Sequence, residues 1–498
     1  MTDDLIARFN DQEQQRYQKM LRLRERGIEP YPLRAARTHT ARQAIDAFTR
    51  GETLQGIQLA GRLVSLRDMG KLTFAHLQDG SAKIQLMIRK DAVGADAYAM
   101  LLKDFDLGDF IGAEGDVVKT KTGEITLQAA HIELLAKTLS PLPEKWHGLK
   151  DTETRYRQRY LDLLSNEEAR QIFVARSRIV SAMRKFLDEQ GFLEVETPAL
   201  QALYGGAAAE PFVTHHNKLD QDMYLRIADE LYLKRLVIGG FDRVYEIGHD
   251  FRNEGVDRTH NPEFTMLEFY EAYADYTVMM RRVEALLIAA AHAVRDALTA
   301  AGLASEAPAF DPAVLQGPFP MLEWLPSLSK ALHVEDVTQL SDAQLRTAAE
   351  HAGVHGVATL SRPKLMDELF QHHVESKIDR PTFVVDYPKE LSPLAKPKRG
   401  NPALTERFEL FAKGKELANA FSELNDPIDQ RQRFEAQARL KAAGDEEASG
   451  VDEDYLRAME YGMPPMGGVG VGMDRLFMYL TGTAHIRDVI LFPTMRPE

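Results

Sequence analysis

The chain has 498 residues, of which 44% are hydrophobic and 27% charged, as expected for a soluble globular protein with room for two or more domains. It contains no cysteine, which excludes disulfides, zinc–thiolate sites, iron–sulfur clusters and cysteine nucleophiles, and fits a reducing, cytoplasmic location. The net charge of −14 argues only weakly against nucleic acid as a partner. The polar, acidic start does not resemble a secretory signal, and no apolar run approaches the roughly 20 residues of a membrane span.

The first 50 residues predict a helical extension, with one helix over residues 10–27 that stops at Gly27. Between residues 16 and 42 lie eight basic residues and two acidic ones. Such a stripe is either a phosphate-binding surface or a solvated helix face, and composition leaves both open. The basic residues are Arg16, Lys19, Arg22, Arg24, Arg26, Arg34, Arg37 and Arg42.

Residues 51–139 change to short strands with turn signals. In KIQLMIR, Ile84, Leu86 and Ile88 alternate with polar or long side chains, which indicates a strand with one buried face. Five such strands within about 80 residues predict a small barrel of the OB type, a fold that commonly binds oligonucleotides. A barrel with a purely structural role remains the alternative.

Residues 140–151 are rich in proline and mixed charge and predict a linker to a second domain, 152–498. A long helix is expected to begin at a capping box, Ser165 with Glu168, and to stop at Gly191. The strand FLEVETP should follow and end at Pro198. Residues around 280–380 predict a helical insertion without a chemical motif, after which strands return.

Two segments of this domain each place an arginine where it could hold a phosphate. They are FRNEGVDRTHNPEFTMLEFYEAY, with Arg252, and GVGVGMDR, with Arg475. Neither is a Walker-type loop, and GVGVGMDR is no dinucleotide fingerprint, because its third glycine comes one residue early. The sequence therefore predicts phosphates held by arginine forks.

Strand alternation brings further polar groups together around these arginines. Arg252 and Glu254 share parity on one predicted strand, and Phe264, Met266, Glu268 and Tyr270 on the next. In KELANAFSEL, one face carries Asn419, Phe421 and Glu423, and the other carries Glu416, Ala418 and Ala420. An exposed face with incidental aromatics is the alternative to a ligand pocket. Glu409 and Glu416 flank a turn at Gly414 and could ligate Mg²⁺ beside phosphates, although two such glutamates more often face solvent.

These residues resemble the signature segments of class II aminoacyl-tRNA synthetases. The helix and strand ending at Pro198 look like the first family motif, FRNEG through EFTMLEFYEAY like the second, and GVGVGMDR like the third. The order of barrel and catalytic domain matches the aspartate, asparagine and lysine subgroup. The runs RYRQRYLDLL, GGAAAEPF, MYLRIADELYLKRL and FSELNDP are closest to bacterial lysine-specific members. The resemblance implies an α+β fold: an OB-type barrel followed by a mainly antiparallel catalytic sheet flanked by helices.

The resemblance also implies roles for individual residues. ATP would be bound by Arg252, Glu254, His260, Phe264 and Arg475, with Arg252 and Arg475 catalytic and Glu409 and Glu416 holding Mg²⁺. L-lysine would be bound by Gly206, Glu230, Glu268, Tyr270, Asn419, Phe421 and Glu423. The anticodon would be contacted by Arg67, Phe74, Gln85 and Glu124.

The implied enzyme forms lysyl-adenylate from L-lysine and ATP, charges tRNA(Lys) at its terminal ribose, and is a homodimer. Lysyl transfer to a protein and a non-catalytic tRNA-binding paralogue remain alternatives. Independently of the resemblance, carboxylates such as Glu268 and Glu423 suit an ammonium taken out of water. Two features depart from the family pattern: Glu210 replaces a usual basic residue, and Ala418 and Ala420 replace glycines and are expected to narrow the floor of the pocket.

Overall fold

The computed structural model describes residues 6–143, 149–301, 307–442 and 450–497. The chain forms two compact units, Met1–Gly148 and Leu149–Glu498, which are considered separately. Part of the predicted linker, residues 144–148, lies outside the described residues, as do residues 1–5 of the predicted extension and 302–306 of the predicted helical insertion. No helix in the described part of the chain is both long and apolar enough to cross a membrane.

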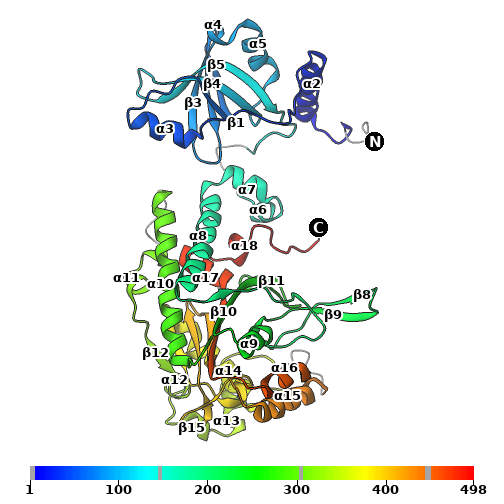
Figure 1. Ribbon diagram of the computed structural model, residues 1–498, viewed down its shortest axis with the longest axis vertical. Coiled ribbons are helices and arrows are strands. Elements are labelled where there is room, and N and C mark those ends of the chain that lie inside the picture. Colours follow the sequence, from blue (N-terminus) through cyan, green and yellow to red (C-terminus); the bar gives the residue numbers. More distant parts are fainter. Residues whose placement is uncertain (1–5, 144–148, 302–306, 443–449, 498) are drawn as a thin grey trace. The chain divides into compact units, whose positions relative to one another are not determined.

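The first unit contains a closed five-stranded barrel, which confirms the predicted OB-type fold (Figure 1). The strands are β1 (Ile57–Asp68), β2 (Leu72–Gln78), β3 (Lys83–Arg89), β4 (Phe110–Lys119) and β5 (Ile125–Ala136), in the order β1-β2-β3-β5-β4. The short helices α4 (Lys90–Val93) and α5 (Ala95–Asp104), which the strand pattern did not predict, connect β3 to β4. As expected, Ile84, Leu86 and Ile88 of β3 point into the buried interior.

Within the described residues, the helices α2 (Asp11–Glu25) and α3 (Ala41–Thr49) precede the barrel. Each begins with a capping box, from Asn10 with Glu13 and from Thr40 with Gln43, so the sequence specifies where both start. Predicted and observed limits of the first helix agree to within two residues.

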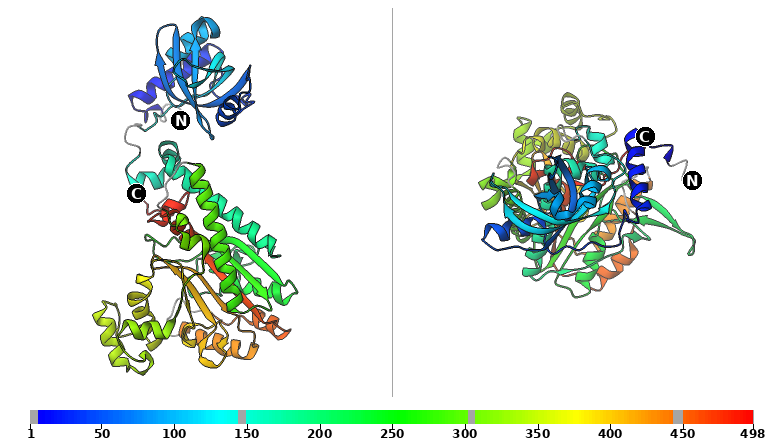
Figure 2. Two further views of the ribbon diagram at one scale, coloured as in Figure 1. Left: turned by 90° about the vertical axis from the view of Figure 1, so that its left-hand side faces the viewer. Right: turned by 90° about the horizontal axis from the view of Figure 1, so that it is seen from above.

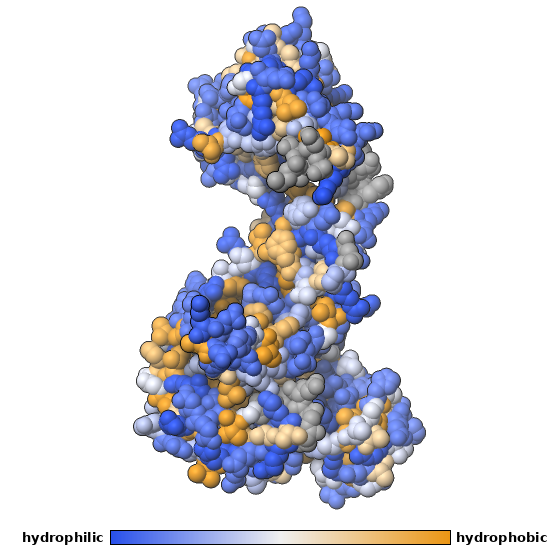
Figure 3. All heavy atoms as spheres, turned by 90° about the vertical axis from the view of Figure 1, so that its right-hand side faces the viewer, coloured by the Kyte–Doolittle hydropathy of each residue, from blue (hydrophilic) through white to orange (hydrophobic). Residues whose placement is uncertain are grey.

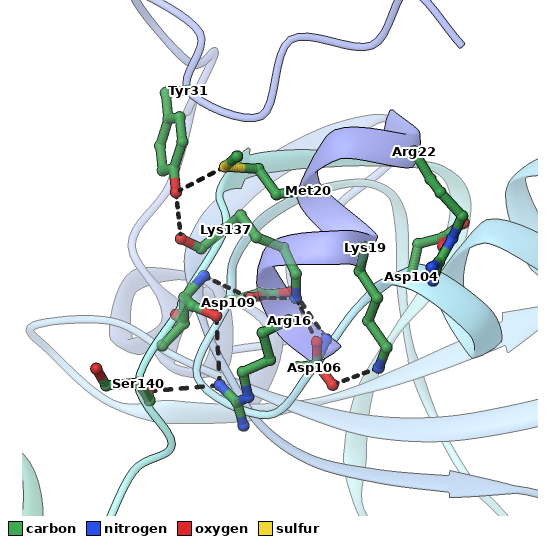
Figure 4. A network of polar contacts seen from close by, with 11 residues as sticks. Arg16, Lys19, Met20, Arg22, Tyr31, Asp104, Asp106, Asp109, Lys137 and Ser140 are labelled. Carbon is green, nitrogen blue, oxygen red and sulfur yellow. Dashed lines mark hydrogen bonds and ion pairs between the residues drawn. The ribbon is translucent and has the colours of Figure 1, made fainter. Parts of the chain in front are cut away.

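Several basic side chains of helix α2 form ion pairs or hydrogen bonds with the rest of the barrel unit (Figure 4). Lys19 pairs with Asp106 at 2.6 Å, and Arg22 and Arg26 both pair with the nearly buried Asp104 at 3.1 Å. Arg16 donates to the backbone oxygens of Thr138 and Ser140. Six of the eight basic residues of the predicted stripe remain exposed, namely Arg22, Arg24, Arg26, Arg34, Arg37 and Arg42. The stripe is therefore partly engaged in contacts within this unit and partly exposed to solvent, and the phosphate-binding interpretation stays a prediction.

Lys137 forms the buried centre of the same network (Figure 4). Its side chain is 0% exposed, and its ammonium contacts Asp106 and, at 2.8 Å, the equally buried Asp109. Tyr31 donates to the Lys137 backbone oxygen at 3.0 Å. A buried ammonium is tolerable only when paired in this way, so the network fixes the chain after β5 against the segment after α2.

The second unit contains an eight-stranded sheet in the order β12-β13-β16-β17-β18-β11-β10-β6, which is antiparallel except at its two outermost pairs. Its strands are β6 (Leu193–Glu194), β10 (Arg243–Phe251), β11 (Glu263–Ala272), β12 (Met321–Glu323), β13 (Thr382–Val385), β16 (Arg407–Ala412), β17 (Lys415–Ser422) and β18 (Met466–Gly472). A three-stranded sheet holds β7 (Leu200–Gln201), β8 (Val213–His216) and β9 (Gln221–Leu225), and β14 (Pro397–Lys398) pairs with β15 (Asn401–Thr405).

Helices cover this sheet, as the α+β prediction requires. The two longest, α8 (Glu167–Glu189) and α10 (Tyr276–Ala300), lie side by side along it (Figures 1 and 2). The other helices are α6 (Thr152–Arg157), α7 (Arg159–Ser165), α9 (Glu230–Ile238), α11 (Pro312–Gln316), α12 (Trp324–Ala331), α13 (Asp342–His351), α14 (Arg362–His373), α15 (Pro427–Ala442), α16 (Glu453–Glu460), α17 (Met473–Thr481) and α18 (Ile486–Val489). Single 3₁₀ turns occur at Pro308–Phe310, Val337–Gln339, Glu375–Lys377 and Lys389–Leu391.

Alternation along the strands separates an apolar face from a polar one. Phe269, Val469 and Ala420 pack with residues of α8, α10 and α17 in one hydrophobic core. Their neighbours Tyr270, Gly468 and Phe421 point the other way and line a cavity. The outer surface is largely hydrophilic on the side shown in Figure 3, where hydrophobic residues form separate patches.

Two local predictions are wrong. Ser165 does not begin the long helix, because it is the last residue of α7. The cap position falls to Asn166, whose side chain donates to Asp162 and accepts no hydrogen bond from the N–H groups of α8. The strand FLEVETP is only two residues long, since β6, at the edge of the sheet, pairs with β10 over Leu193 and Glu194 alone. Gly191 does end α8, with a φ of +80°.

Candidate active site

The polar face of the large sheet carries a cavity of about 400 Å³. Every residue predicted to bind ATP, lysine or Mg²⁺ lines it, so the structure brings together groups that are up to about 270 residues apart in the chain. They are Gly206, Glu230, Arg252, Glu254, His260, Phe264, Glu268, Tyr270, Glu409, Glu416, Asn419, Phe421, Glu423 and Arg475. Their roles are taken up below as proposals.

Arg252 and Phe264 form one wall of the cavity. Strand β10 ends at Phe251, so Arg252 and Glu254 lie in the loop after the strand, not on the strand as predicted. Backbone pairing of Arg252 with Pro262 still holds this loop beside β11, at an N–O distance of 2.9 Å. The Arg252 guanidinium lies 5.1 Å from the centroid of the Phe264 ring, and its buried Nε has no hydrogen-bond partner among the described residues. A donor of this kind is available to an anionic ligand.

His260 and Arg475 meet across the cavity although 215 residues separate them. Arg475 Nη2 lies 2.9 Å from His260 Nε2, and because arginine can only donate, Nε2 is the acceptor. His260 Nδ1 then donates to Asp257 at 2.8 Å. Burial alone would raise the pKa of Asp257, but hydrogen bonds from Thr259 and His260 hold it below its usual range. Asp257 is thus an anion that fixes the tautomer and orientation of His260.

Glu409 and Glu416 face each other near the same end of the cavity. Burial raises the pKa of Glu409 to about 7, with Arg407 lowering it and Glu416 raising it. Burial with the charges of Glu409 and Glu416 likewise raises the pKa of Glu375 to about 8. A divalent cation would relieve this crowding of carboxylates, so the residues present fit a Mg²⁺ site. Among the described residues, no group of three or more His, Asp or Glu is arranged to hold a metal ion.

A β-bulge explains how Glu416 reaches the cavity. Strand alternation placed Glu416 on the face opposite Asn419. In the structure β17 pairs with β16 through Leu410–Ala418 and then Phe411–Glu416, so Leu417 is an extra residue. The bulge takes up this residue and returns Glu416 to the cavity face. The predicted parity is wrong at this position because a bulge has no clear signal in KELANAFSEL.

The opposite end of the cavity is acidic and buried. Glu230, Glu268 and Glu423 are at most 6% exposed, and Tyr270 donates to Glu268 at 2.8 Å. Burial, together with the charges of Asp250 and Glu230, raises the pKa of Glu268 to about 8. Burial also raises the pKa of Glu230 and of Glu423, and Lys234 opposes both shifts. An incoming cation would replace the lost solvation of these carboxylates.

The glycine-rich strand β18 forms the floor between the two ends. A Cβ atom on Gly468 would lie 2.0 Å from Glu423 Oε1 and 2.3 Å from Tyr270 Cε1. A Cβ on Gly470 would meet nothing closer than 3.9 Å. A side chain at position 468 would therefore collide with the Glu423 and Tyr270 side chains, whereas one at position 470 would collide with nothing. Gly206, with a φ of +91°, likewise lies against Glu230, its Cβ position being 3.1 Å from Glu230 Cβ.

The departures from the family pattern lie outside the cavity wall. Ala418 and Ala420 pack in the hydrophobic core on the other face of β17, so the expectation that they narrow the pocket floor is wrong. Strand alternation with Asn419 and Phe421 is the reason. Glu210 accepts from Asn253 Nδ2 at 3.1 Å, next to Arg252, and is not among the lining residues.

Two residues at the site escaped the sequence argument. Arg407 donates to Asn419 at 3.1 Å and contacts Glu409, so it positions two predicted ligand groups. Arg407 and Glu409 are two residues apart on β16 and so lie on the same face of the strand, which could have placed Arg407 at the cavity. Lys234 contacts Glu230 and Glu423 from behind the cavity. Its position four residues after Glu230 on a helix predicts the first contact, but nothing in the sequence predicts the second.

The four predicted anticodon residues share one outer face of the barrel. Arg67 on β1 pairs in register with Phe74 on β2, and Gln85 lies on the neighbouring β3. Glu124 accepts from Gln85 Nε2 at 2.7 Å and lies 3.1 Å from His76 Nε2. A half-buried aromatic ring flanked by exposed polar groups suits the stacking and edge recognition of an unpaired base.

Comparison with known proteins agrees with this geometry. Residues 151–496 match the family model for tRNA synthetases class II (D, K and N), and residues 57–135 match that for an OB-fold nucleic acid binding domain. The chain is 52% identical to the lysine–tRNA ligase of Pelotomaculum thermopropionicum, over 97% of this chain and 94% of that protein. It is 52% identical to the lysine–tRNA ligase of Moorella thermoacetica, over 98% of each chain, and 49% identical to that of Lactococcus lactis subsp. lactis, over 99% of each. The chain therefore belongs to the class II tRNA synthetases of the aspartate, lysine and asparagine group.

Proposed function

We propose that this chain is a lysine–tRNA ligase, which forms lysyl-adenylate from L-lysine and ATP and then transfers lysine to the 3′-terminal ribose of tRNA(Lys). The observation that carries the proposal is a single cavity lined both by the guanidinium groups of Arg252 and Arg475 and by the buried carboxylates of Glu230, Glu268 and Glu423. Relatives named lysine–tRNA ligases, about half identical over nearly the whole chain, support it.

ATP is bound at the arginine end. Arg252 contacts the α-phosphate and the lysine carboxylate, using the Nε donor that has no partner among the described residues. Phe264 stacks on the adenine beside Glu254, and His260 with Arg475 holds the outer phosphates. Guanidinium forks suit phosphate oxygens in both geometry and charge.

Glu409 and Glu416 are the carboxylates that would hold Mg²⁺. When bound, the cation would neutralise phosphate charge. Arg407 and Tyr387 orient Glu409 for this purpose, because Tyr387 donates to it at 2.9 Å while Arg407 contacts its other oxygen.

Lysine is bound at the acidic end. Gly206 and Glu230 receive its α-ammonium, Asn419 contacts its carboxylate, and Glu268, Tyr270, Phe421 and Glu423 surround its side chain. Charge balance supports this arrangement: the three carboxylates Glu230, Glu268 and Glu423, when ionised, exceed the charge of Lys234 by two, and lysine brings two ammonium groups. The negative charge of the lysine carboxylate is balanced by Arg252.

The first reaction step needs no general base, because the attacking carboxylate is already ionised near neutral pH. Catalysis is then a matter of holding the carboxylate in line with the α-phosphate and stabilising the charge that develops on it, which Arg252 and Arg475 do. In the second step the tRNA hydroxyl attacks the activated carbonyl, while Arg67, Phe74, Gln85 and Glu124 contact the anticodon.

The enzyme acts as a cytoplasmic homodimer in this proposal. Exposed apolar residues near α8 support such an interface, among them Tyr160, Leu164, Val174 and Leu193. Sedimentation equilibrium of the purified chain should give twice the 56.1 kDa chain mass. A monomer at micromolar concentration would contradict the dimer without affecting the chemistry.

The deciding experiment is aminoacylation of purified tRNA(Lys) with each amino acid in turn. We expect charging with lysine alone, together with lysine-dependent ATP–pyrophosphate exchange. Charging with another amino acid, or lysine activation with transfer to a protein and none to tRNA, would overturn the proposal.

A further inference from the structure

Lys234 is the buried cation behind the acidic end of the cavity. It lies on α9, four residues after Glu230, and its side chain is 0% exposed. Its ammonium contacts Glu230 Oε1 and Glu423 Oε2, two carboxylates from different elements of the fold. The rings of Phe421 and Tyr270 lie 5.4 and 6.0 Å from the nitrogen.

Lys234 does not itself line the cavity, whereas both of its carboxylate partners do. Glu230 begins α9, and Glu423 directly follows β17, so no backbone pairing joins them. The ammonium is thus the direct link between the two. Glu423 Oε1, its oxygen away from this link, is buried and has no hydrogen-bond partner among the described residues.

We propose that Lys234 is a positioning residue that holds Glu230 and Glu423 at one fixed separation and so sets the length of the diamino acid that the cavity accepts. The inference rests on the proposed function, in which Glu230 receives the α-ammonium and Glu423 the side-chain ammonium of lysine. With one oxygen of each carboxylate tied to the same nitrogen, neither carboxylate can move toward a shorter ligand without breaking a buried ion pair.

The surrounding charges make this link necessary. The groups that act on Lys234, Glu230 and Glu423 are Glu268, Tyr270, Arg407 and Tyr455, and Arg407 is engaged with Glu409 and Asn419. Without Lys234, two carboxylates would share a buried site with Glu268 nearby, and they would separate or take up protons. Either response alters the spacing that the ligand meets.

Ornithine is the natural probe, since it is lysine with one methylene fewer. Loss of one methylene alone changes selectivity roughly 10–200-fold in a fitted pocket. If Lys234 fixes the spacing, ornithine can reach only one of the two carboxylates in the wild-type enzyme. In a variant without the link it can reach both.

The test is Lys234→Met, assayed by ATP–pyrophosphate exchange with lysine and with ornithine as a competitor. We expect KM for lysine to rise at least tenfold, while KM for ATP and the rate at saturating lysine stay within about threefold. The ratio of the ornithine inhibition constant to the lysine KM should fall at least fivefold. Lys137→Met is the matched control, because Lys137 is equally buried and paired with two carboxylates but belongs to the barrel unit. It should leave unchanged both the lysine KM and the ratio of the ornithine inhibition constant to the lysine KM.

An equal loss in every kinetic constant, or an unchanged ornithine ratio, would overturn the inference and leave the proposed function standing. A wild-type enzyme that does not activate lysine would instead overturn the proposed function. If Lys234→Met does not fold, a crystal structure of the wild-type enzyme with lysine decides the matter. Lys234 between Glu230 and Glu423, with one ligand nitrogen on each, supports the inference, and Lys234 in contact with only one carboxylate or neither overturns it.

Discussion

At the residue scale, Gly468 supports the acidic end of the cavity by having no side chain. It pairs with Tyr270 on β11 and Phe421 on β17, so it lies between two predicted lysine-binding residues. A methyl group there would collide with Glu423 Oε1 and the Tyr270 ring. We expect Gly468→Ala to raise KM for lysine at least tenfold in pyrophosphate exchange. Gly470→Ala, two residues along the same strand, should change KM for lysine less than twofold; equal effects would contradict the steric argument.

The pKa of Glu268 predicts how lysine binding depends on pH. Because that pKa is raised to about 8, the carboxyl group carries a proton at pH 7 in the empty cavity. The lysine side-chain ammonium stays charged well above this range and favours the ionised carboxylate. KM for lysine should therefore fall as pH rises from 6 to 7.5, by up to about tenfold per pH unit.

Glu268→Gln provides the control for this titration. The variant should bind lysine more weakly and lose most of the pH dependence in that window, because the titrating group is gone. Measurements need lysine KM at saturating ATP, since the pKa of Glu409, about 7, affects the metal end of the cavity. A lysine KM that stays constant between pH 6 and 7.5 would show that Glu268 is already ionised before the ligand arrives.

Arg252 offers the simplest test of the ATP end. Its buried Nε, unpartnered among the described residues, lies beside Phe264, where the α-phosphate is proposed to bind. Removing such a donor typically costs roughly 10²–10³ in rate. We expect Arg252→Ala to lower lysine-dependent pyrophosphate exchange at least a hundredfold, whereas Arg281→Ala, an exposed arginine of α10, should have no effect. Exchange near the wild-type rate would reject the role.

At the element scale, Asp104 fastens α2 to the barrel. It is nearly buried and pairs with both Arg22 and Arg26, one helical turn apart. Asp104→Asn should release the helix, so backbone amides of residues 11–25 should exchange with solvent faster while the barrel strands remain protected. Asp46→Asn is a matched control, because its pair with Arg42 is exposed and 4.0 Å long. Unchanged exchange in α2 would mean that apolar contacts such as Leu23 hold it instead.

Element identity was largely readable from the sequence, and contacts between elements were not. Period-two alternation predicted the barrel strands and the cavity face of Asn419, Phe421 and Glu423, because buried strands must alternate. The capping box at Ser165 failed because the same serine could end a preceding helix, which local spacing does not reveal. The contact of Lys234 with Glu423 was beyond prediction from pattern, since 189 residues separate the two and only the tertiary fold joins them.

At the scale of the whole molecule, the two units divide the proposed reaction between them. Phe74 lies on the outer face of the barrel, in a different unit from the cavity. Stacking of an unpaired base on such a ring contributes roughly 1–3 kcal/mol. We expect Phe74→Ala to weaken tRNA charging, seen as a higher KM for tRNA, and to leave pyrophosphate exchange unchanged.

Phe110→Ala serves as the control for Phe74→Ala, because Phe110 is an exposed aromatic residue of the barrel that lies beside Arg62 instead of the predicted anticodon residues. It should alter neither assay. If Phe74→Ala reduced both assays equally, a folding defect would be the simpler explanation, and circular dichroism of the purified variant would reveal it.

The bulge at Leu417 determines which single-residue insertions or deletions the β16–β17 hairpin can tolerate. An insertion or deletion of one residue within a strand ordinarily moves every side chain beyond it to the opposite face of the sheet. Here the bulge already accommodates one extra residue. Deleting Leu417 would therefore keep Glu416 on the cavity face and restore regular pairing between β16 and β17. Deleting Ala420 would instead bring Asn419 opposite Phe408 and turn its amide toward the hydrophobic core. The hairpin therefore has one position where homologous chains can differ in length without turning a ligand group away.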